Sequence, residues 1–300
     1  MKVVALSGGV GGARLVQGLA DVLQPGSLTV VANTGDDFDH WGLRICPDLD
    51  TLLYTLSREA PLERGWGLER ESFEALEMVR RYGGDAWFAL GDRDLGAHVF
   101  RTHQLALGVR LTAIADRMLR GLGVTGVTLL PMADAPKPTL IDTADGTLTF
   151  QDWLVRRRGA PPVTGVRWGG DPPATAEVLA ALEAADVIVI APSNPYVSVA
   201  PILGLPGVRE RLSARPVVGV SPIVAGAAIK GPLAQMIPAL AGRPASAAAV
   251  RDHYGDLLDG FVIERGDDAS GVVLHTSTVM GDREDRARLA REVLAFAEAL

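Results

Sequence analysis

Apolar and polar residues follow one another along the chain in a repeated order of strand, loop and helix. Short β-branched runs over Lys2–Leu6 and Leu28–Ala32 predict buried strands, and apolar residues three and four apart predict a helix over Ala13–Leu23 between them. The same order returns later, with one predicted helix and two predicted strands: Ala174–Ala185, Asp186–Ala191 and Pro216–Val220. Strands that alternate with helices are typical of parallel sheets with crossover helices. The pattern predicts an α/β fold with a doubly wound, mostly parallel sheet.

The pattern changes between residues 52 and 122, where it is mostly helical. The segments ESFEALEMVRRYG and LTAIADRMLRGLG both carry apolar residues at helical spacing. We expect a helical insertion or subdomain over residues 52–122, within a single domain that spans residues 1–300. Leu140–Phe150 holds an Asp-Gly pair between two alternating runs, which predicts a β-hairpin. Asp282–Leu300 predicts an amphipathic helix.

The composition limits the classes of partner and the cellular compartment that we expect for the protein. The chain has 300 residues, 48% of them apolar, which is enough for a large core. Its net charge is −7 with scattered acidic residues, so we expect neither a nucleic acid nor a membrane surface as partner. Cys46 is the single cysteine, which excludes an internal disulfide framework. The apolar run before the first glycines is too short for a signal peptide, and we expect a cytoplasmic protein.

The stretch SGGVGGAR, Ser7–Arg14, follows the first predicted strand and precedes a predicted helix. A plain turn needs only one or two glycines, and each further glycine loses backbone entropy on folding. Exposed N–H groups before a helix can instead hold phosphate oxygens. The dinucleotide fingerprint would need a third glycine at Arg14, and no Gly-Lys-Ser/Thr of a P-loop follows. The stretch therefore predicts a phosphate site of neither standard kind.

Two later loops follow predicted strands and should lie at the same edge of the sheet. APSNPYVSVAPIL begins at Ala191, and VSPIV covers Val220–Val224. Because ligands bind beyond the carboxyl ends of parallel strands, Ser193, Asn194 and Ser221 could meet the ligand of the glycine loop. Helix capping by Ser193 or Ser198 is an equal alternative, since capping and anion binding use the same geometry.

The second predicted strand runs into an acidic loop, NTGDDFDHWGLRICPDLDTLLY. Its aspartates would repel a neighbouring phosphate unless a divalent cation lay between them, and hard oxygen ligands suit Mg²⁺. The five aspartates are Asp36, Asp37, Asp39, Asp48 and Asp50. The alternative for any one of them is a solvated turn, with Asp50 as the cap of the following helix.

GDRD, Gly91–Asp94, follows the apolar run AWFAL. Arg93 between two carboxylates is compatible with a surface ion pair, which is the commoner case. An arginine fork at the end of a strand would instead orient a phosphate or a planar heterocycle. This motif alone does not decide between the two.

Seven segments together resemble the 2-phospho-L-lactate transferase family of deazaflavin coenzyme F-420 biosynthesis. They occur in the family's order and span nearly the whole chain: LSGGVGGARL, VANTGDDFDHWGLRICPDLDTLLY, LGDRD, LPMADAP, FQDWLVRRRG, APSNPYVSVAPIL and VSPIVAGAAIKGP. The resemblance implies a Rossmann-like core with a helical part, usually dimeric. It also implies a Mg²⁺-dependent enzyme that joins a phosphorylated three-carbon acid, carried as a guanosine diphosphate conjugate, to the deazaflavin alcohol Fo and releases GMP.

On the matching positions, Asp50 and Arg93 would contact Fo and serve catalysis, and Asp50 and Asp48 would bind Mg²⁺. The residues expected to hold the nucleotide and its phosphates are Gly8, Gly9, Gly11, Gly12, Asn33, Thr34, Ser193, Asn194 and Ser221. The identity of the three-carbon acid stays open between lactate, enolpyruvate and glycerate.

Two other functions remain as alternatives. One is a nucleotide-sugar-binding regulatory protein of the related gluconeogenesis-factor family, which shares a glycine loop of this type without the CPDLDT and GDRD blocks. The other is a Rossmann dehydrogenase, which is disfavoured by Arg14 and by Asn33 in place of a ribose-binding acid.

Overall fold

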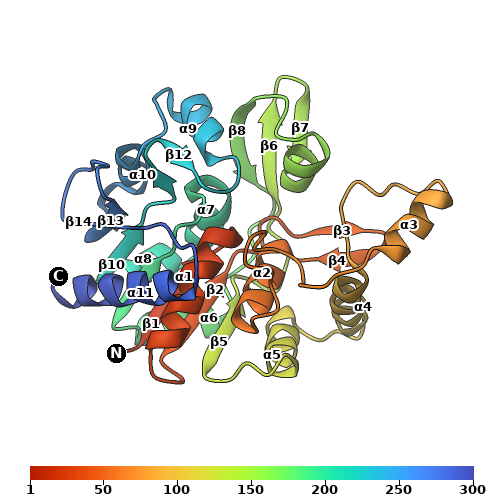
Figure 1. The fold of residues 1–300 in the computed structure, drawn as a ribbon, viewed down its shortest axis with the longest axis horizontal. Coiled ribbons are helices and arrows are strands. Elements are labelled where there is room, and N and C mark those ends of the chain that lie inside the picture. The colour runs from red at the N-terminus through yellow and green to blue at the C-terminus, as the bar shows by residue number, and fades with distance from the viewer.

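The computed structural model of the protein describes residues 1–300, and its centre is a seven-stranded sheet in which every neighbouring pair is parallel (Figure 1). The strands lie in the order β14-β13-β10-β9-β1-β2-β5. Their bounds are β1 Val3–Ser7, β2 Leu28–Ala32, β5 Val127–Pro131, β9 Val187–Ile190, β10 Val217–Val220, β13 Gly260–Glu264 and β14 Val273–Thr276. The predicted α/β fold with a doubly wound parallel sheet is confirmed.

Both faces of the sheet are covered by helices. In β1, Val3 and Ala5 pack into one hydrophobic cluster, whereas Val4 and Leu6 pack into another on the opposite face, as the alternation of side chains along a strand requires. The first face carries α1 Gly9–Val22, α2 Pro47–Leu56, α5 Leu111–Gly121 and α11 Arg283–Glu298. The second carries α6 Ala176–Ala184, α7 Ala200–Leu203, α8 Val208–Leu212, α9 Leu233–Ala241 and α10 Ala247–Tyr254.

The order of the strands creates a crevice between β1 and β9. The chain leaves β1 for β2 and β5 on one side and later returns to lay β9, β10, β13 and β14 on the other side. The two segments that follow β1 and β9 therefore leave the sheet in different directions, which opens a space beyond their carboxyl ends. The glycine loop follows β1 at Ser7, and the SNP loop follows β9 at Ile190.

Two smaller parts project from the sheet (Figure 1). One is a three-stranded antiparallel sheet of β6 Thr139–Thr143, β7 Gly146–Thr149 and β8 Val163–Trp168, with the short π-helix η1 Asp152–Arg156. The other is an arm of β3 Phe38–His40, β4 Leu43–Ile45 and the helices α3 Glu74–Arg81 and α4 Asp92–Ala106. Shorter elements complete the chain: π-helix η2 Pro195–Val199, β11 Ile223–Val224, β12 Ala227–Ala228 and η3 Gly255–Leu257.

Most predicted elements are present, and two differ from the prediction. The β-hairpin within Leu140–Phe150 is formed by β6 and β7. Helix α1, however, begins at Gly9 rather than Ala13, so that three of the four loop glycines belong to its first turn. AWFAL is not a strand, and GDRD opens the helix α4 instead of following a strand. The helical periodicity of α4 is weak because it buries few residues: His98 and Arg101.

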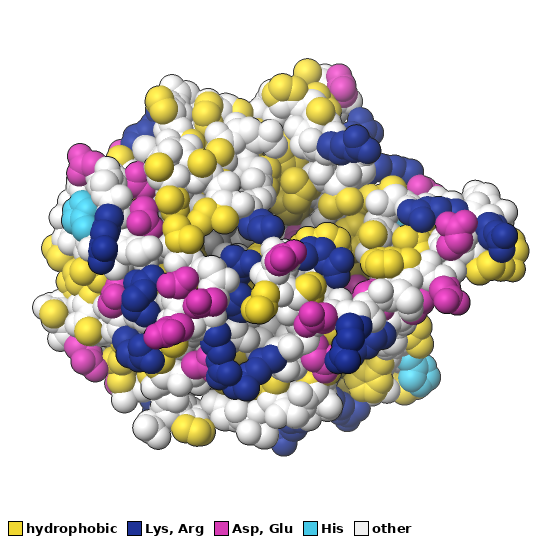
Figure 2. Space-filling view, in the orientation of Figure 1, with side chains coloured by type: hydrophobic (Ala, Val, Ile, Leu, Met, Phe, Trp, Pro, Cys, Tyr) yellow, Lys and Arg dark blue, Asp and Glu magenta, His cyan; other side chains and the backbone are white.

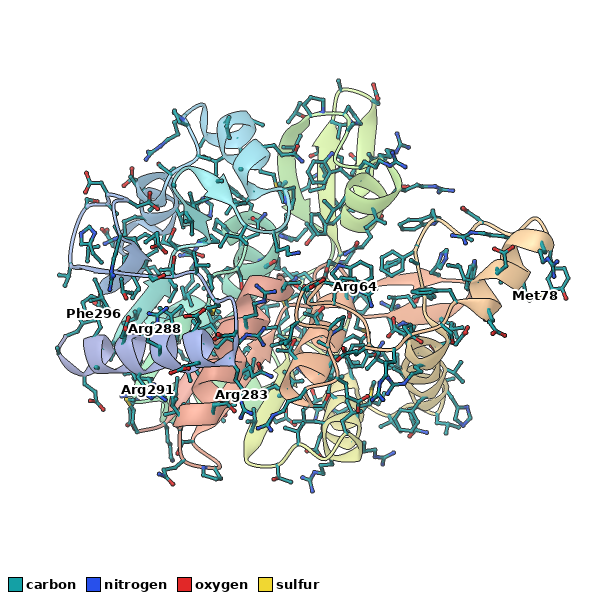
Figure 3. All side chains as sticks on the ribbon, in the orientation of Figure 1. Arg64, Met78, Arg283, Arg288, Arg291 and Phe296 are labelled. Atoms are coloured by element: carbon teal, nitrogen blue, oxygen red, sulfur yellow. The ribbon has the colours of Figure 1, made fainter.

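Helix α11 lies along α1 and fixes its position, and Figure 3 shows Arg283, Arg288 and Arg291 along α11. Arg283 donates two hydrogen bonds to Asp21 at the end of α1. Gly18 of α1 faces the backbone of Arg286, so closely that a Cβ atom at Gly18 would collide with the Arg286 carbonyl oxygen. No helix in the structure is both long enough and apolar enough to cross a membrane.

The close approach of these two helices predicts a cost for any side chain at Gly18. Gly18→Ala should lower the free energy of unfolding by about 1–3 kcal/mol because the helices must separate. Gly96→Ala is the matched control: Gly96 lies in α4 with no atom within 4 Å of the added methyl, so this change should stabilise by about 0.5–1 kcal/mol. Urea unfolding of both variants measures the difference, and equal effects would contradict the close packing.

Candidate functional site

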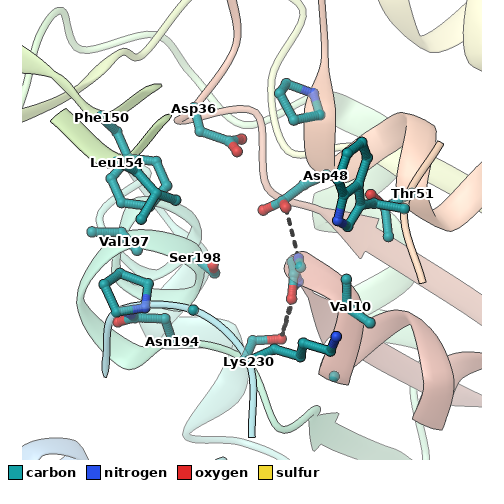
Figure 4. A pocket seen from close by; sticks show the side chains of 18 of the residues that line it. Val10, Asp36, Asp48, Thr51, Phe150, Leu154, Asn194, Val197, Ser198 and Lys230 are labelled. Carbon is teal, nitrogen blue, oxygen red and sulfur yellow. Dashed lines mark hydrogen bonds between the residues drawn. The ribbon is translucent and has the colours of Figure 1, made fainter. Parts of the chain in front are cut away.

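A cavity of about 480 Å³ lies beyond the carboxyl ends of β1, β2, β9 and β10. Figure 2 shows this side of the molecule hollowed between the β6–β8 sheet and the arm, with hydrophobic side chains on the walls. In Figure 4, Phe150, Leu154 and Val197 line one side, and Val10, Asp48 and Thr51 line the other. The cavity therefore has an apolar wall that faces the glycine loop and the start of α2.

The glycine loop and the SNP loop are tied together at the floor of this cavity. The Ser193 hydroxyl accepts a hydrogen bond from the Gly8 N–H (3.1 Å) and donates one to the Gly8 carbonyl oxygen (2.8 Å). The Gly9 N–H donates to Asp48 Oδ1 (2.7 Å), and no side chain caps the first turn of α1 otherwise. The N–H groups of Val10 and Gly11 lie in this same turn, where a helix offers no backbone acceptor. They can therefore donate to an anion in the cavity.

The loop glycines serve two different requirements. Gly9 has a positive φ of 68°, a conformation that glycine adopts without strain. Gly11 packs closely, because a Cβ atom there would lie 2.6 Å from the carbonyl oxygen of Pro192. Gly12 is enclosed by the hydroxyls of Ser7 and Ser193 and does not line the cavity. Packing between β1 and β9 therefore explains part of the glycine content, and Gly8, Gly9 and Gly11 line the cavity itself.

Asn33 lies beneath the cavity and positions its carboxylates. It is fully buried, and its amide donates to Asp48 Oδ2 (2.9 Å) and to Asp36 Oδ1 (3.3 Å). Burial raises the pKa of Asp48 to about 6, although hydrogen bonds from Asn33 and Gly9 lower it. Burial and repulsion by Asp48 raise the pKa of Asp36 well above its usual range, and Gln151 donates to its other oxygen (3.0 Å). Thr34 is buried beside Asn33 and does not line the cavity.

Asp50 occupies a different part of the cavity, against α4. Arg101 donates from Nη2 to Asp50 Oδ1. Asp50 Oδ2 has no hydrogen-bond partner, even though Asp50 is buried and only 5% exposed. The oxygens of Asp50 and Asp94 and a ring nitrogen of His98 lie within 4.8 Å of one another. Helix α2 begins at Pro47 with Cys46 as its N-cap, so Asp50 lies inside the helix and the capping alternative is wrong.

Arg93 does not line the cavity. It lies in the first turn of α4, where Nη1 donates to the Glu69 carbonyl oxygen (2.8 Å) and Nη2 pairs with Glu59 (2.5 Å). Its own N–H donates to Glu71 (2.7 Å). In this structure Arg93 holds the segment before α3, and its contact with Fo stays a prediction.

Asn194 and Ser221 both line the cavity and both make local contacts. The Asn194 side chain accepts from the Tyr196 N–H (2.9 Å) and caps η2, which neither Ser193 nor Ser198 does. The Ser221 hydroxyl pairs with the backbone of Ile223.

Four further cavity residues were missed by sequence reasoning. Arg14 and Lys230 are the two lining residues with a Lys or Arg side chain, and Trp87 and Phe88 line the arm side. Arg14 is anchored by the carbonyl oxygens of Met280 (3.2 Å) and Leu62 (2.7 Å). Lys230 lies in the segment VSPIVAGAAIKGP, and Trp87 and Phe88 lie in AWFAL. Nothing in the sequence around these residues indicates that they line one cavity.

Comparison with known proteins identifies the family. The family model described as 2-phospho-L-lactate transferase CofD matches residues 3–295. The phosphoenolpyruvate transferase of Thermobifida fusca is 43% identical over 283 residues, which cover 89% of this chain and 87% of that protein. The 2-phospho-L-lactate transferase of Methanosarcina mazei is 39% identical over 269 residues, which cover 89% and 88%.

A solved structure supports the fold. Protein BH3568 from Bacillus halodurans superposes with a TM-score of 0.65 at 19% identity, over 98% of this chain and 99% of that one. At this identity the likeness concerns the fold alone. The family model and the two transferases cover most of the chain, and so the protein belongs to the 2-phospho-L-lactate transferase CofD family and is a transferase of the phosphoenolpyruvate or 2-phospho-L-lactate type.

Proposed function

We propose that this transferase joins a phosphorylated three-carbon acid, carried as a guanosine diphosphate conjugate, to a ribityl hydroxyl of Fo, with formation of a phosphodiester and release of GMP. The observation that carries the proposal is the Asp50 carboxylate. Its Oδ2 is buried and has no hydrogen-bond partner. Asp50 lines the cavity, and so does the first turn of α1. One cavity thus offers a base and an anion site together.

The diphosphate would bind at the start of α1. Free N–H groups at a helix N-terminus favour phosphate oxygens, and Val10 and Gly11 supply them here. Lys230 adds a positive charge: in Figure 4 its side chain points along the cavity toward Val10. Its ammonium has a single long contact, to the Glu63 carbonyl oxygen at 3.4 Å, and is exposed. It is therefore available to a substrate anion.

The deazaflavin ring would bind on the arm side, against Trp87 and Phe88. These two rings lie 5.5 Å apart in an edge-on arrangement, and Phe38 packs on both, at 5.7 Å and 4.9 Å. Such mutual support fixes the ring planes in advance, and an extended aromatic surface suits a planar heterocycle. Asp50 lines the same cavity, so it could accept the proton of the ribityl hydroxyl attached to the bound ring system.

The reaction would be an in-line displacement at phosphorus. The ribityl hydroxyl oxygen forms a bond to the phosphorus that bears the three-carbon acid, and Asp50 Oδ2 accepts the hydroxyl proton. The bond from that phosphorus to the bridging oxygen breaks, and the oxygen leaves with GMP. Backbone N–H groups of α1 and the Lys230 ammonium stabilise the charge that develops on the phosphate oxygens.

The residues present fit a magnesium ion, which forms part of the proposal. Asp50 Oδ2 is an orphaned buried carboxylate oxygen, and Asp48, two residues earlier in the first turn of α2, also lines the cavity and contacts Gly9 of the glycine loop. Hard oxygen ligands of this kind suit Mg²⁺. When bound, Mg²⁺ would neutralise charge on the phosphates. We also expect a homodimer, as the resemblance implies, and a cytoplasmic location, in keeping with the single cysteine and the short apolar run before the glycine loop.

Substitution of Trp87 tests the Fo side of the cavity. Trp87→Ala should raise the KM for Fo about tenfold or more and leave the KM for the donor within about twofold, because stacking on an aromatic side chain contributes roughly 1–3 kcal/mol. Steady-state kinetics with each substrate varied in turn gives both values. Tyr82→Ala, at an exposed position outside the cavity, is the control. A rise in the donor KM alone would assign this wall to the nucleotide.

Substitution of Lys230 should act on the other substrate. Lys230→Met should raise the KM for the guanosine diphosphate conjugate about tenfold. This is the lower end of the effect expected for losing a charge-assisted hydrogen bond, because Lys230 is exposed and its contact is weakened by solvent. The KM for Fo should not change. Added salt should weaken donor binding less in the variant than in the wild type, since one ion pair is gone. Lys2→Met is the control, and an unchanged donor KM would remove Lys230 from the phosphate site.

Asp50 is tested by a nearly isosteric change. Asp50→Asn should slow the chemical step by about 10²–10⁴-fold, the usual contribution of a general base. Single-turnover rates across a Mg²⁺ titration separate the two roles: rescue at high Mg²⁺ indicates a metal ligand, and a rate that stays low indicates a base. Asp116→Asn on the exposed face of α5 is the control. A variant as fast as the wild type would eliminate Asp50 and direct the test to Asp48.

A further inference from the structure

Helix α4 presents three polar side chains to α2 at helical spacing, two of which, Asp94 and His98, line the cavity. Asp94, His98 and Arg101 are four and three residues apart, so they lie on one face of the helix. The facing helix α2 supplies Asp50 and Tyr54, which are also four residues apart. We call these five side chains the α2–α4 network. His98 and Arg101 are 1% and 0% exposed, so the network is part of the protein interior and not a solvated surface.

Arg101 is held in one place from two sides. Its Nη2 donates to Asp50 Oδ1, and its Nη1 donates to the backbone carbonyl oxygen of Arg44 in β4 (3.1 Å). This arrangement engages one oxygen of Asp50 and leaves Oδ2 alone. Burial raises the pKa of Asp50, while the Arg101 charge lowers it. Without the guanidinium, the buried carboxylate would have no partner of opposite charge at Oδ1.

The His98 ring lies between Asp50 and a second carboxylate, Asp94. Arg101 Nη1 lies 3.2 Å from His98 Nδ1, and an arginine can only donate, so in this contact Nδ1 is the acceptor and the ring proton is on Nε2. That nitrogen faces Asp94 Oδ2 at 3.3 Å, and the Tyr54 hydroxyl donates to Asp94 Oδ1 (2.5 Å). His98 Nδ1 is 3.8 Å from Asp50 Oδ2, beyond hydrogen-bond distance, so the histidine flanks this oxygen without occupying it.

We propose that Arg101 and His98 are positioning residues for the transfer reaction: Arg101, which also donates to His98, fixes the Asp50 carboxylate so that Oδ1 is held by the protein and Oδ2 is presented to the substrate hydroxyl. Asp94, which accepts a hydrogen bond from Tyr54, lies 3.3 Å from His98 Nε2 on the other side of the ring. This inference rests on the proposed function. It gives the GDRD segment a second role, in which Asp94 and the helix it opens orient the base, separately from any contact by Arg93.

A double-mutant cycle between Asp50 and Arg101 tests the proposal. The four proteins are the wild type, Asp50→Asn, Arg101→Met and the double variant, assayed with Fo and, in turn, the guanosine diphosphate conjugates of lactate, enolpyruvate and glycerate. Arg101→Met should lower kcat at least about 10²-fold with the KM of the donor within about threefold. The double variant should be no slower than Asp50→Asn, because Arg101 acts through Asp50. Additive losses, or a normal kcat in Arg101→Met, would overturn the proposal.

Two further variants keep the test decisive if Arg101→Met does not fold. Arg101→Lys retains the charge but loses the second contact to Arg44, so it should fold and recover only part of kcat. His98→Gln should lower kcat, whereas His103→Gln, at an exposed position of the same helix, should not. A normal kcat in both Arg101→Lys and His98→Gln would overturn the proposal.

The failure of the proposed function is distinguishable from the failure of this inference. A wild-type enzyme that joins Fo to none of these conjugates overturns the proposed function. Urea unfolding of the same four proteins then still measures whether Asp50 and Arg101 are coupled: non-additive stabilities support the contact between them, and additive stabilities overturn it.

Discussion

The contact on which the site depends is the pair of hydrogen bonds that Asp48 accepts from Gly9 and Asn33. Gly9 begins α1 directly after β1, Asn33 follows β2, and Asp48 lies in the first turn of α2. One carboxylate therefore joins three elements at the carboxyl edge of the sheet. Without it, the Gly9 N–H at the start of α1 would lose its acceptor and the buried Asn33 amide would lose its shortest hydrogen bond, which is costly in an interior. The carboxylate thus stabilises the fold at the same place where the cavity opens.

This arrangement divides the cavity by chemistry. The side formed by α1, the SNP loop and Lys230 offers N–H groups and a positive charge, and the arm side offers Trp87 and Phe88. Asp50 and the α2–α4 network lie in the part of the wall built by α2 and α4. Because each part is built by different elements, binding of the two substrates can be altered separately. The resident carboxylates are supported by Asn33, Gln151 and Arg101 and not by solvent.

The sequence predicts the four central strands β10, β9, β1 and β2, because both faces of parallel strands are buried and apolar runs such as Val187–Ile190 reflect that burial; it does not predict the outer strands β5, β13 and β14. It also predicts that Ser193 lies near the glycine loop, since both follow strands of one parallel sheet. The helix α4 is less visible, because its exposed apolar residues Val99 and Phe100 obscure the periodicity. Arg101 has no local signature at all. An arginine in a polar helix usually indicates solvent, and only the tertiary contact with Asp50 gives it a role. The same holds for Lys230, whose partner loop lies more than 160 residues earlier.

The packing of α11 on α1 has a consequence for the order of events during synthesis. Helix α1 carries the glycine loop and is complete after Val22, but Arg14 is anchored by Met280, and Gln17 accepts a hydrogen bond from Arg286. Chains grow from the N-terminus, and contacts so distant in sequence form late. A nascent chain on the ribosome therefore contains the whole phosphate-binding segment long before it has the residues that hold that segment in place. The nucleotide site gains its full support only when the last helix has left the ribosome.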